Sequence, residues 1–162
     1  MRLASYFLAV GGGTLAQSTI VPVVGVAGVV PDLPIVLVIL LALRRGPEVG
    51  CLTGFALGLA QDVVAGGPLG LQALAKAVIG FVVGELPRVC LVSNPLVSII
   101  ATVLATLADG ALRFAVLQLF QYPAAFGELF GRVILPQAGL NGLLMALFVL
   151  LPALRVRVTG PL

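Results

Sequence analysis

Five charged side chains in this sequence are candidates for chemistry, because each falls within or beside a long apolar stretch. They are Asp32, Asp62, Lys76, Asp109 and Arg113. Placing a charge inside a membrane costs roughly 2.5–3.5 kcal/mol, so each charge needs a partner or a function. The chemistry open to these residues is ion pairing, ligand binding or contact with a partner helix.

Their spacing suggests two pairs. Asp109 and Arg113 lie one helical turn apart with the acid first, which is a favourable i, i+4 arrangement. For this pair the sequence favours a structural role, in which the charges hold helices together. Asp62 and Lys76 are expected to meet across a helical hairpin, and for them a structural pair and a partner- or ligand-binding site are both open.

Histidine is absent from the chain, which excludes histidine-based metal ligation, general-base catalysis and catalytic triads. The serines have no general base nearby in the sequence, and Gly11-Gly12-Gly13 lacks the lysine of a phosphate-binding loop. The sequence therefore predicts no catalytic, cofactor-binding or metal site, and a protein that is not an enzyme.

The composition sets the environment of these charges. The chain has 162 residues, of which 60% are hydrophobic and 9% charged, whereas soluble domains average about 25% charged residues. This excludes an ordinary soluble domain and a disordered chain. Because the nine Lys and Arg residues are scattered between apolar runs, it also excludes a nucleic-acid-binding protein. We expect one integral membrane domain over residues 1–162.

Apolar runs predict an all-α, polytopic protein with six transmembrane helices. The segments are Leu3–Val21, Asp32–Leu43, Glu48–Val64, Leu71–Leu86, Pro95–Phe120 and Phe130–Leu154. Proline-containing breaks between them read as helix starts. The second segment is too short to cross a bilayer alone. It needs either residues 23–30 as an irregular extension or a buried position among the other helices.

The positive residues predict that both termini lie inside, in the cytoplasm. In that orientation the cytoplasmic ends carry Arg2, Arg44, Arg45, Arg88, Arg155 and Arg157. The outer turns carry only Arg132, at an edge. An alternative for the first segment is a cleaved signal peptide, but its basic region is a single residue.

Most of the remaining polar residues then map to the outer half of the membrane. They are Asp32, Gln61, Gln72, Gln118, Gln137 and Asn141, together with the two pairs above. Such a cluster either fixes the helices to one another or forms a site that opens outward to a ligand or a partner helix.

Glycines at four-residue spacing predict close packing of the third and fourth segments, since small residues let helix backbones approach in lipid. Centred on the turn at position 69, an antiparallel hairpin would place Gly54 opposite Gly84 and Gly58 opposite Gly80. The same register brings Asp62 to Lys76.

The landmarks of this region resemble those of the rod shape-determining membrane protein MreD family. They are Pro31-Asp32-Leu33, Arg45-Gly46-Pro47, the run from Gly54 to Asp62, and the run from Gly66 to Leu71. The Asp109–Arg113 pair matches no landmark of the family.

The resemblance implies a non-enzymatic scaffold of the bacterial cell-elongation (rod) complex, multi-pass in the cytoplasmic (inner) membrane. It implies MreC as the direct partner, and through it RodA, a class B penicillin-binding transpeptidase and MreB. Peptidoglycan synthesis and cell shape are the processes it would serve. No nucleic acid and no cofactor is implied, and membrane lipids surround the protein.

An alternative function belongs to another class, the substrate-binding S-components of energy-coupling vitamin transporters. The MreD family is similar to them in fold, which implies an S-component-like helical bundle. The outward polar cluster suits a transporter. Only 6% of the residues are aromatic, however, and there is no Trp to line a vitamin site.

Overall fold

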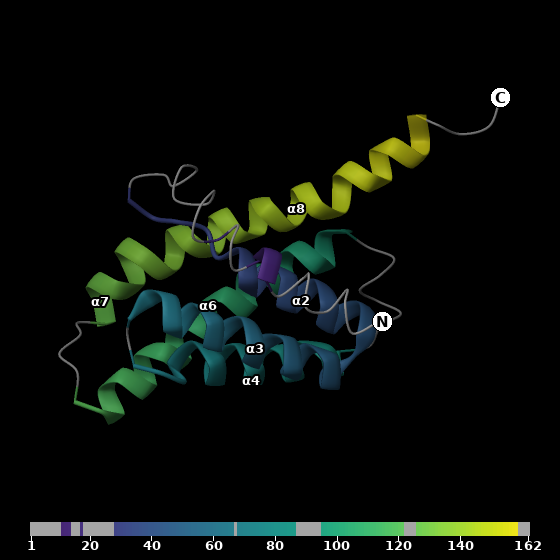
Figure 1. The fold of residues 1–162 in the computed structure, drawn as a ribbon. Helices are drawn as coiled ribbons and strands as arrows, with labels where there is room; N and C mark the ends of the chain where they lie inside the picture. The colour runs from purple at the N-terminus through teal and green to yellow at the C-terminus, as the bar shows by residue number, and fades with distance from the viewer. Residues whose placement is uncertain are drawn as a thin grey trace.

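The computed structural model describes residues 11–13, 17, 28–66, 68–86, 95–121 and 126–158, and every element assigned in these ranges is a helix (Figure 1). The elements are α2 (Leu33–Arg45), α3 (Pro47–Ala65), α4 (Leu71–Glu85), α6 (Pro95–Leu119), α7 (Phe126–Leu129), a π-helical turn η2 (Phe130–Ile134) and α8 (Leu135–Val158). The predicted all-α class and five of the six predicted segments agree with these elements. Apart from residues 11–13 and 17, the segment Leu3–Val21 lies outside the described residues.

Helix starts follow the proline signals in the sequence. Pro47 and Pro95 are the first residues of α3 and α6, where a missing backbone N–H is least costly. Pro34 lies in the first turn of α2, and the Asp32 side chain caps that helix by accepting a hydrogen bond from the Ile35 N–H at 3.2 Å.

Within the described ranges, three helical stretches are long and apolar enough to cross a membrane: Pro47–Ala65, Pro95–Leu119 and Gly127–Leu150. The helices α2, with 13 residues, and α4, with 15, are shorter. At 1.5 Å per residue, α2 is only about 20 Å long.

The short helix α2 occupies the centre of the described helices. Ile35, Val36, Val38, Ile39 and Ala42 have no exposed surface. The helix packs against α3, α4, α6 and α8, with Ile79, Val83, Ala105 and Met145 contributed to the same core. For the second segment the structure shows the buried position; of the alternative extension, residues 23–27 lie outside the described residues and residues 28–30 are not helical.

The final long helix begins with a π-helical turn, which has a cause in the sequence. Pro136 has no N–H for the carbonyl of Arg132, so the ordinary i, i−4 ladder is broken there. The Leu135 N–H instead bonds the Phe130 carbonyl, five residues back. The turn buries Ile134 against Gly110 of α6, where any larger residue would collide with it.

Helices α3 and α4 run antiparallel with their backbones in contact (Figure 1). A Cβ atom added at Gly54 would overlap the carbonyl of Lys76, and one at Gly58 would overlap the backbone of Gln72 and Ala73. We call this line of contact between the two helices the glycine seam. On the α4 side of it, a Cβ atom added at Gly80 would overlap Gly50, and one at Gly84 would overlap Gly46 and Pro47. All four predicted packing glycines therefore lie in this seam.

The predicted register of the hairpin is wrong. Gly54 lies opposite Lys76 rather than Gly84, a shift of eight residues along α4. The cause is the connection, which folds back along the last turn of α3 instead of extending beyond it. Gly66 and Gly70 make this reversal possible with φ values of 65° and 96°, a region that favours glycine.

Candidate functional site

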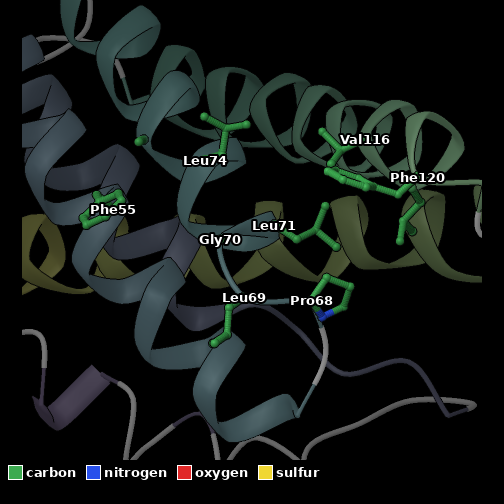
Figure 2. A pocket seen from close by; sticks show the side chains of 10 residues that line it. Phe55, Pro68, Leu69, Gly70, Leu71, Leu74, Val116 and Phe120 are labelled. Carbon is green, nitrogen blue, oxygen red and sulfur yellow. The ribbon is translucent and has the colours of Figure 1, made fainter.

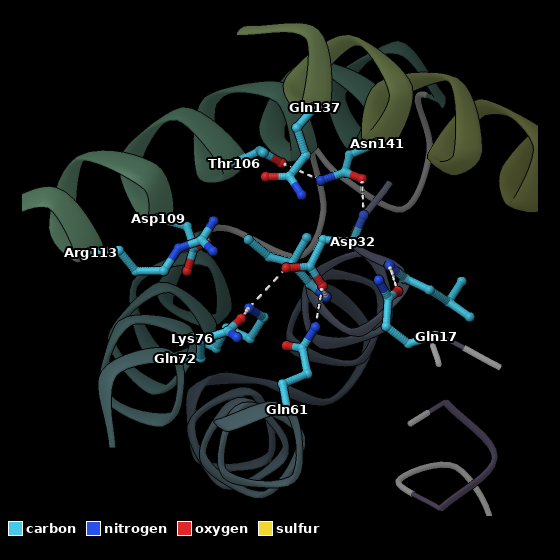
Figure 3. A network of polar contacts seen from close by, with 12 residues as sticks. Gln17, Asp32, Gln61, Gln72, Lys76, Thr106, Asp109, Arg113, Gln137 and Asn141 are labelled. Carbon is cyan, nitrogen blue, oxygen red and sulfur yellow. Dashed lines mark hydrogen bonds and ion pairs between the residues drawn. The ribbon is translucent and has the colours of Figure 1, made fainter. Parts of the chain in front are cut away.

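A network of buried polar side chains lies between α2, α3, α4, α6 and α8, and its centre is an ion pair between Asp32 and Lys76 (Figure 3). The Lys76 Nζ lies 2.9 Å from Asp32 Oδ2. Lys76 is fully buried and Asp32 is 3% exposed, so neither charge is shared with solvent. Because an unpaired buried charge is strongly destabilising, each residue depends on the other.

Neighbouring amides complete the coordination of this pair. The Gln61 side chain donates to Asp32 Oδ1 at 3.2 Å, and Lys76 Nζ donates to Gln72 Oε1 at 2.9 Å. The backbone N–H of Asp32 donates to Asn141 Oδ1 at 2.7 Å, and Asn141 in turn donates to the Thr106 hydroxyl at 3.2 Å. The start of α2 is thus tied to α3, α6 and α8.

The segment entering α2 is also held by side-chain amides. Gln137 of α8 donates to the Val30 carbonyl at 3.0 Å. Gln17 donates to the Pro31 carbonyl at 3.1 Å and accepts from the Leu33 N–H at 2.9 Å. These bonds satisfy backbone groups that have no helical partner, which is the requirement for irregular backbone buried among membrane helices.

The predicted pairing of Asp62 with Lys76 is wrong. Asp62 instead caps the start of α4, where its carboxylate accepts hydrogen bonds from the backbone N–H groups of Gly70, Gln72 and Ala73 at 2.9–3.2 Å. The folded-back connection brings these donors to the carboxylate. A negative charge at a helix N-terminus is stabilised by the free N–H groups and by the helix dipole.

Replacing Asp62 with alanine is expected to lower the free energy of unfolding by about 1–2 kcal/mol, the range for loss of a helix cap. Unfolding in mixed dodecyl sulfate micelles measures it. Asp62→Asn is the matched control, since an asparagine side chain retains a capping oxygen and should cost less. If Asp62→Asn cost more than Asp62→Ala, the capping role would be contradicted.

The predicted Asp109–Arg113 pair is confirmed. Arg113 Nη2 lies 2.7 Å from Asp109 Oδ2, one turn apart on α6. The Asp109 side chain is fully buried, whereas that of Arg113 is 22% exposed. In the part of the chain that the structure describes, Asp109 Oδ1 and Arg113 Nε are buried with no hydrogen-bond partner. This pair is less completely satisfied than the Asp32–Lys76 pair.

The structure thus brings four of the five predicted charges into two ion pairs and uses the fifth as a helix cap. In each pair the negative charge of the aspartate cancels the positive charge of its partner, so both pairs are electrically neutral in the interior. Gln61, Gln72, Gln137 and Asn141, predicted only as part of an outward polar cluster, are members of the network. Thr106 was not predicted, although the spacing of Ser98, Thr102 and Thr106 on one buried face of α6 could have indicated it.

Two cavities border the α4–α6 contact at the end where α4 begins. The larger, about 580 Å³, is apolar and runs from Phe55 past Leu71 and Leu74 to Val116 and Phe120 (Figure 2). We call it the apolar groove. The smaller, about 240 Å³, is lined by Asp62, Gln72 and Arg113 together with apolar residues of α6, α7 and η2. We call it the polar cavity.

Almost the whole chain matches a known protein family. A family model described as "rod shape-determining protein MreD" matches residues 2–156. No curated protein and no solved structure matches the chain.

Proposed function

Since the chain belongs to the MreD family of rod shape-determining proteins, we propose that it is a non-enzymatic scaffold of the bacterial cell-elongation complex. In this role it binds MreC directly. Through MreC it helps to position RodA, a class B penicillin-binding transpeptidase and MreB, and so to organise peptidoglycan synthesis.

The membrane arrangement we propose is multi-pass, with six helices in the cytoplasmic membrane and both termini inside. Three long apolar helices and the family support an integral membrane protein. Arg44 and Arg45 end α2 at an exposed position, as cytoplasmic residues would. Arg2 and Arg88 lie outside the described residues, as do the side chains of Arg155 and Arg157.

The single observation that carries the scaffold proposal is the exposed apolar face of the α3–α4 hairpin. Leu52 and Leu59 on α3, seven residues apart, and Val78 and Phe81 on α4, three apart, are exposed by 38–64%. We call these four residues the hairpin face. These side chains point away from the glycine seam on the outer sides of α3 and α4, and the seam holds the two backbones behind them, so a partner helix meets a fixed surface on either helix.

The buried side of the hairpin supports the same role. Gly50 and Gly80 also touch Ala42 and Val38 of α2, and the Asp32–Lys76 pair joins α2 to α4. A partner helix that packs on the hairpin face therefore meets a surface fixed from behind. Binding to a preformed surface loses little conformational entropy.

The test is co-purification of the tagged protein with MreC in mild detergent, comparing Leu52→Trp with Leu143→Trp. Leu52 and Leu143 have similar exposures, 64% and 68%, but Leu143 lies on α8. We expect about tenfold less MreC with Leu52→Trp, equivalent to about 1.4 kcal/mol of lost affinity, and wild-type recovery with Leu143→Trp. Equal recovery from both variants would reject the hairpin face as the docking surface.

The same experiment separates the scaffold from a vitamin-transporter S-component. Recovery of MreC, RodA or the transpeptidase supports the scaffold. Recovery of ATPase subunits and a transmembrane coupling subunit would replace it with vitamin uptake, and the polar network would then be the first candidate for a substrate site.

A further inference from the structure

The apolar groove and the polar cavity adjoin each other. Pro68, Leu71 and Leu117 line both, so the two volumes are neighbours across the same side chains. One volume is bounded by hydrocarbon and the other carries a cation, a carboxylate and an amide. A single molecule that fits both must therefore be amphipathic, with a polar end and an apolar chain.

Arg113 determines the chemistry of the polar end. Its Nη2 contacts Asp109, but its buried Nε has no hydrogen-bond acceptor within the described ranges. A buried donor without an acceptor is costly, and arginine keeps its charge under all ordinary conditions. The planar guanidinium suits the oxygens of a phosphate, which can bond two N–H groups at once.

Asp62 narrows the class of ligand further. Its carboxylate lines the same cavity as Arg113, and the backbone N–H groups that it accepts from stabilise a negative charge there. A ligand with only negative charge would meet repulsion at this carboxylate. A headgroup that carries a phosphate and a compact ammonium matches both side chains, since the phosphate faces Arg113 and the ammonium faces Asp62.

We propose that the two cavities together bind one phosphatidylethanolamine-type lipid, with its phosphate at Arg113, its primary ammonium at Asp62 and one acyl chain in the apolar groove. In Figure 2 the groove extends from Pro68 and Phe120 at one end to Phe55 at the other, which gives the chain a path along α4 and α6. A partner helix does not fit inside the polar cavity, because a helix with side chains measures about 10–12 Å across. The polar cavity has a volume of only about 240 Å³.

The absence of tryptophan from the chain allows a direct test. Phe55→Trp places one fluorophore at the far end of the groove. Phe148 lies on α8, does not line either cavity and is 39% exposed against 51% for Phe55, so Phe148→Trp is the matched control. Both variants are reconstituted into phosphatidylcholine vesicles, and the fluorescence is quenched by phosphatidylethanolamine with brominated acyl chains.

We expect quenching of the Phe55→Trp variant to reach half its maximum at about one-tenth of the mole fraction that the Phe148→Trp variant requires, the ratio for one charge-assisted contact. Brominated phosphatidylglycerol, which lacks the ammonium, should quench both variants alike. Equal quenching of both variants by phosphatidylethanolamine would overturn the site. Preferential quenching of the Phe55→Trp variant by phosphatidylglycerol would overturn the assignment of the ammonium to Asp62.

A second variant tests the role of Arg113 without leaving the Asp109 charge unpaired. Asp109→Asn combined with Arg113→Gln removes both charges of the pair; asparagine has the shape of aspartate, and glutamine is shorter than arginine but keeps a polar N–H donor. In the Phe55→Trp background it should abolish the tenfold preference while the thermal unfolding midpoint shows that the helices still pack. If the preference persisted in a folded protein, Arg113 would not hold the phosphate.

Discussion

Replacing Lys76 with methionine is expected to lower the free energy of unfolding by about 3–5 kcal/mol, the range for removal of one member of a buried ion pair. Methionine fills nearly the same volume but leaves the Asp32 carboxylate 3% exposed with no cation at 2.9 Å. The loss should be visible as a shift of the unfolding transition in mixed dodecyl sulfate micelles.

A double-mutant cycle identifies the partner of Lys76. Asp32→Asn combined with Lys76→Met removes both charges, and asparagine can still cap α2 and accept from Gln61. We expect the double variant to recover at least half of the loss, since neutral replacement of a whole buried pair is often tolerated. Recovery with Asp62→Asn instead would favour the Asp62–Lys76 pairing predicted from the sequence and contradict the structure.

Replacing Gly54 with alanine should cost about 3 kcal/mol, the upper end of the range for overpacking. The added methyl group overlaps the carbonyl of Lys76 and the following peptide nitrogen, which are backbone atoms that cannot rotate away. The two helices must therefore separate along the seam. Loss of partner binding through the hairpin face should accompany the loss of stability, because the face depends on that seam.

Gly139→Ala is the matched control for this change. Gly139 also lies within a long helix, α8, but a Cβ atom there would meet nothing within 4 Å. Because alanine favours helix by about 1 kcal/mol over glycine, this variant should be as stable as wild type or slightly more so. Similar losses from both substitutions would show that helix-to-helix contact is not what Gly54 provides.

The fold was predictable where the signal is local. Apolar length, proline starts and four-residue glycine spacing depend on neighbouring residues alone, so the helices and the packing glycines could be read from the sequence. The Asp109–Arg113 pair was predictable for the same reason, as its members lie one turn apart.

The register and the central ion pair were not predictable, because both depend on the path of the chain between helices. An antiparallel hairpin of α3 and α4 with its turn centred on position 69 would place Asp62 opposite Lys76. The positive φ values of Gly66 and Gly70 instead fold the connection back, which gives Asp62 three backbone donors and leaves Lys76 for Asp32. Asp32 is brought there by the burial of α2, and no spacing in the sequence encodes that contact.

The burial of α2 has a consequence for how the protein is made. Because this helix is buried against other helices along most of its length, contacts with protein more than with lipid fix its position. One of these neighbours, Asn141, is synthesised 109 residues after the Asp32 N–H that it binds. The start of α2 therefore gains this hydrogen-bond partner only after α8 has been made, so the packing around Asp32 is completed late in synthesis.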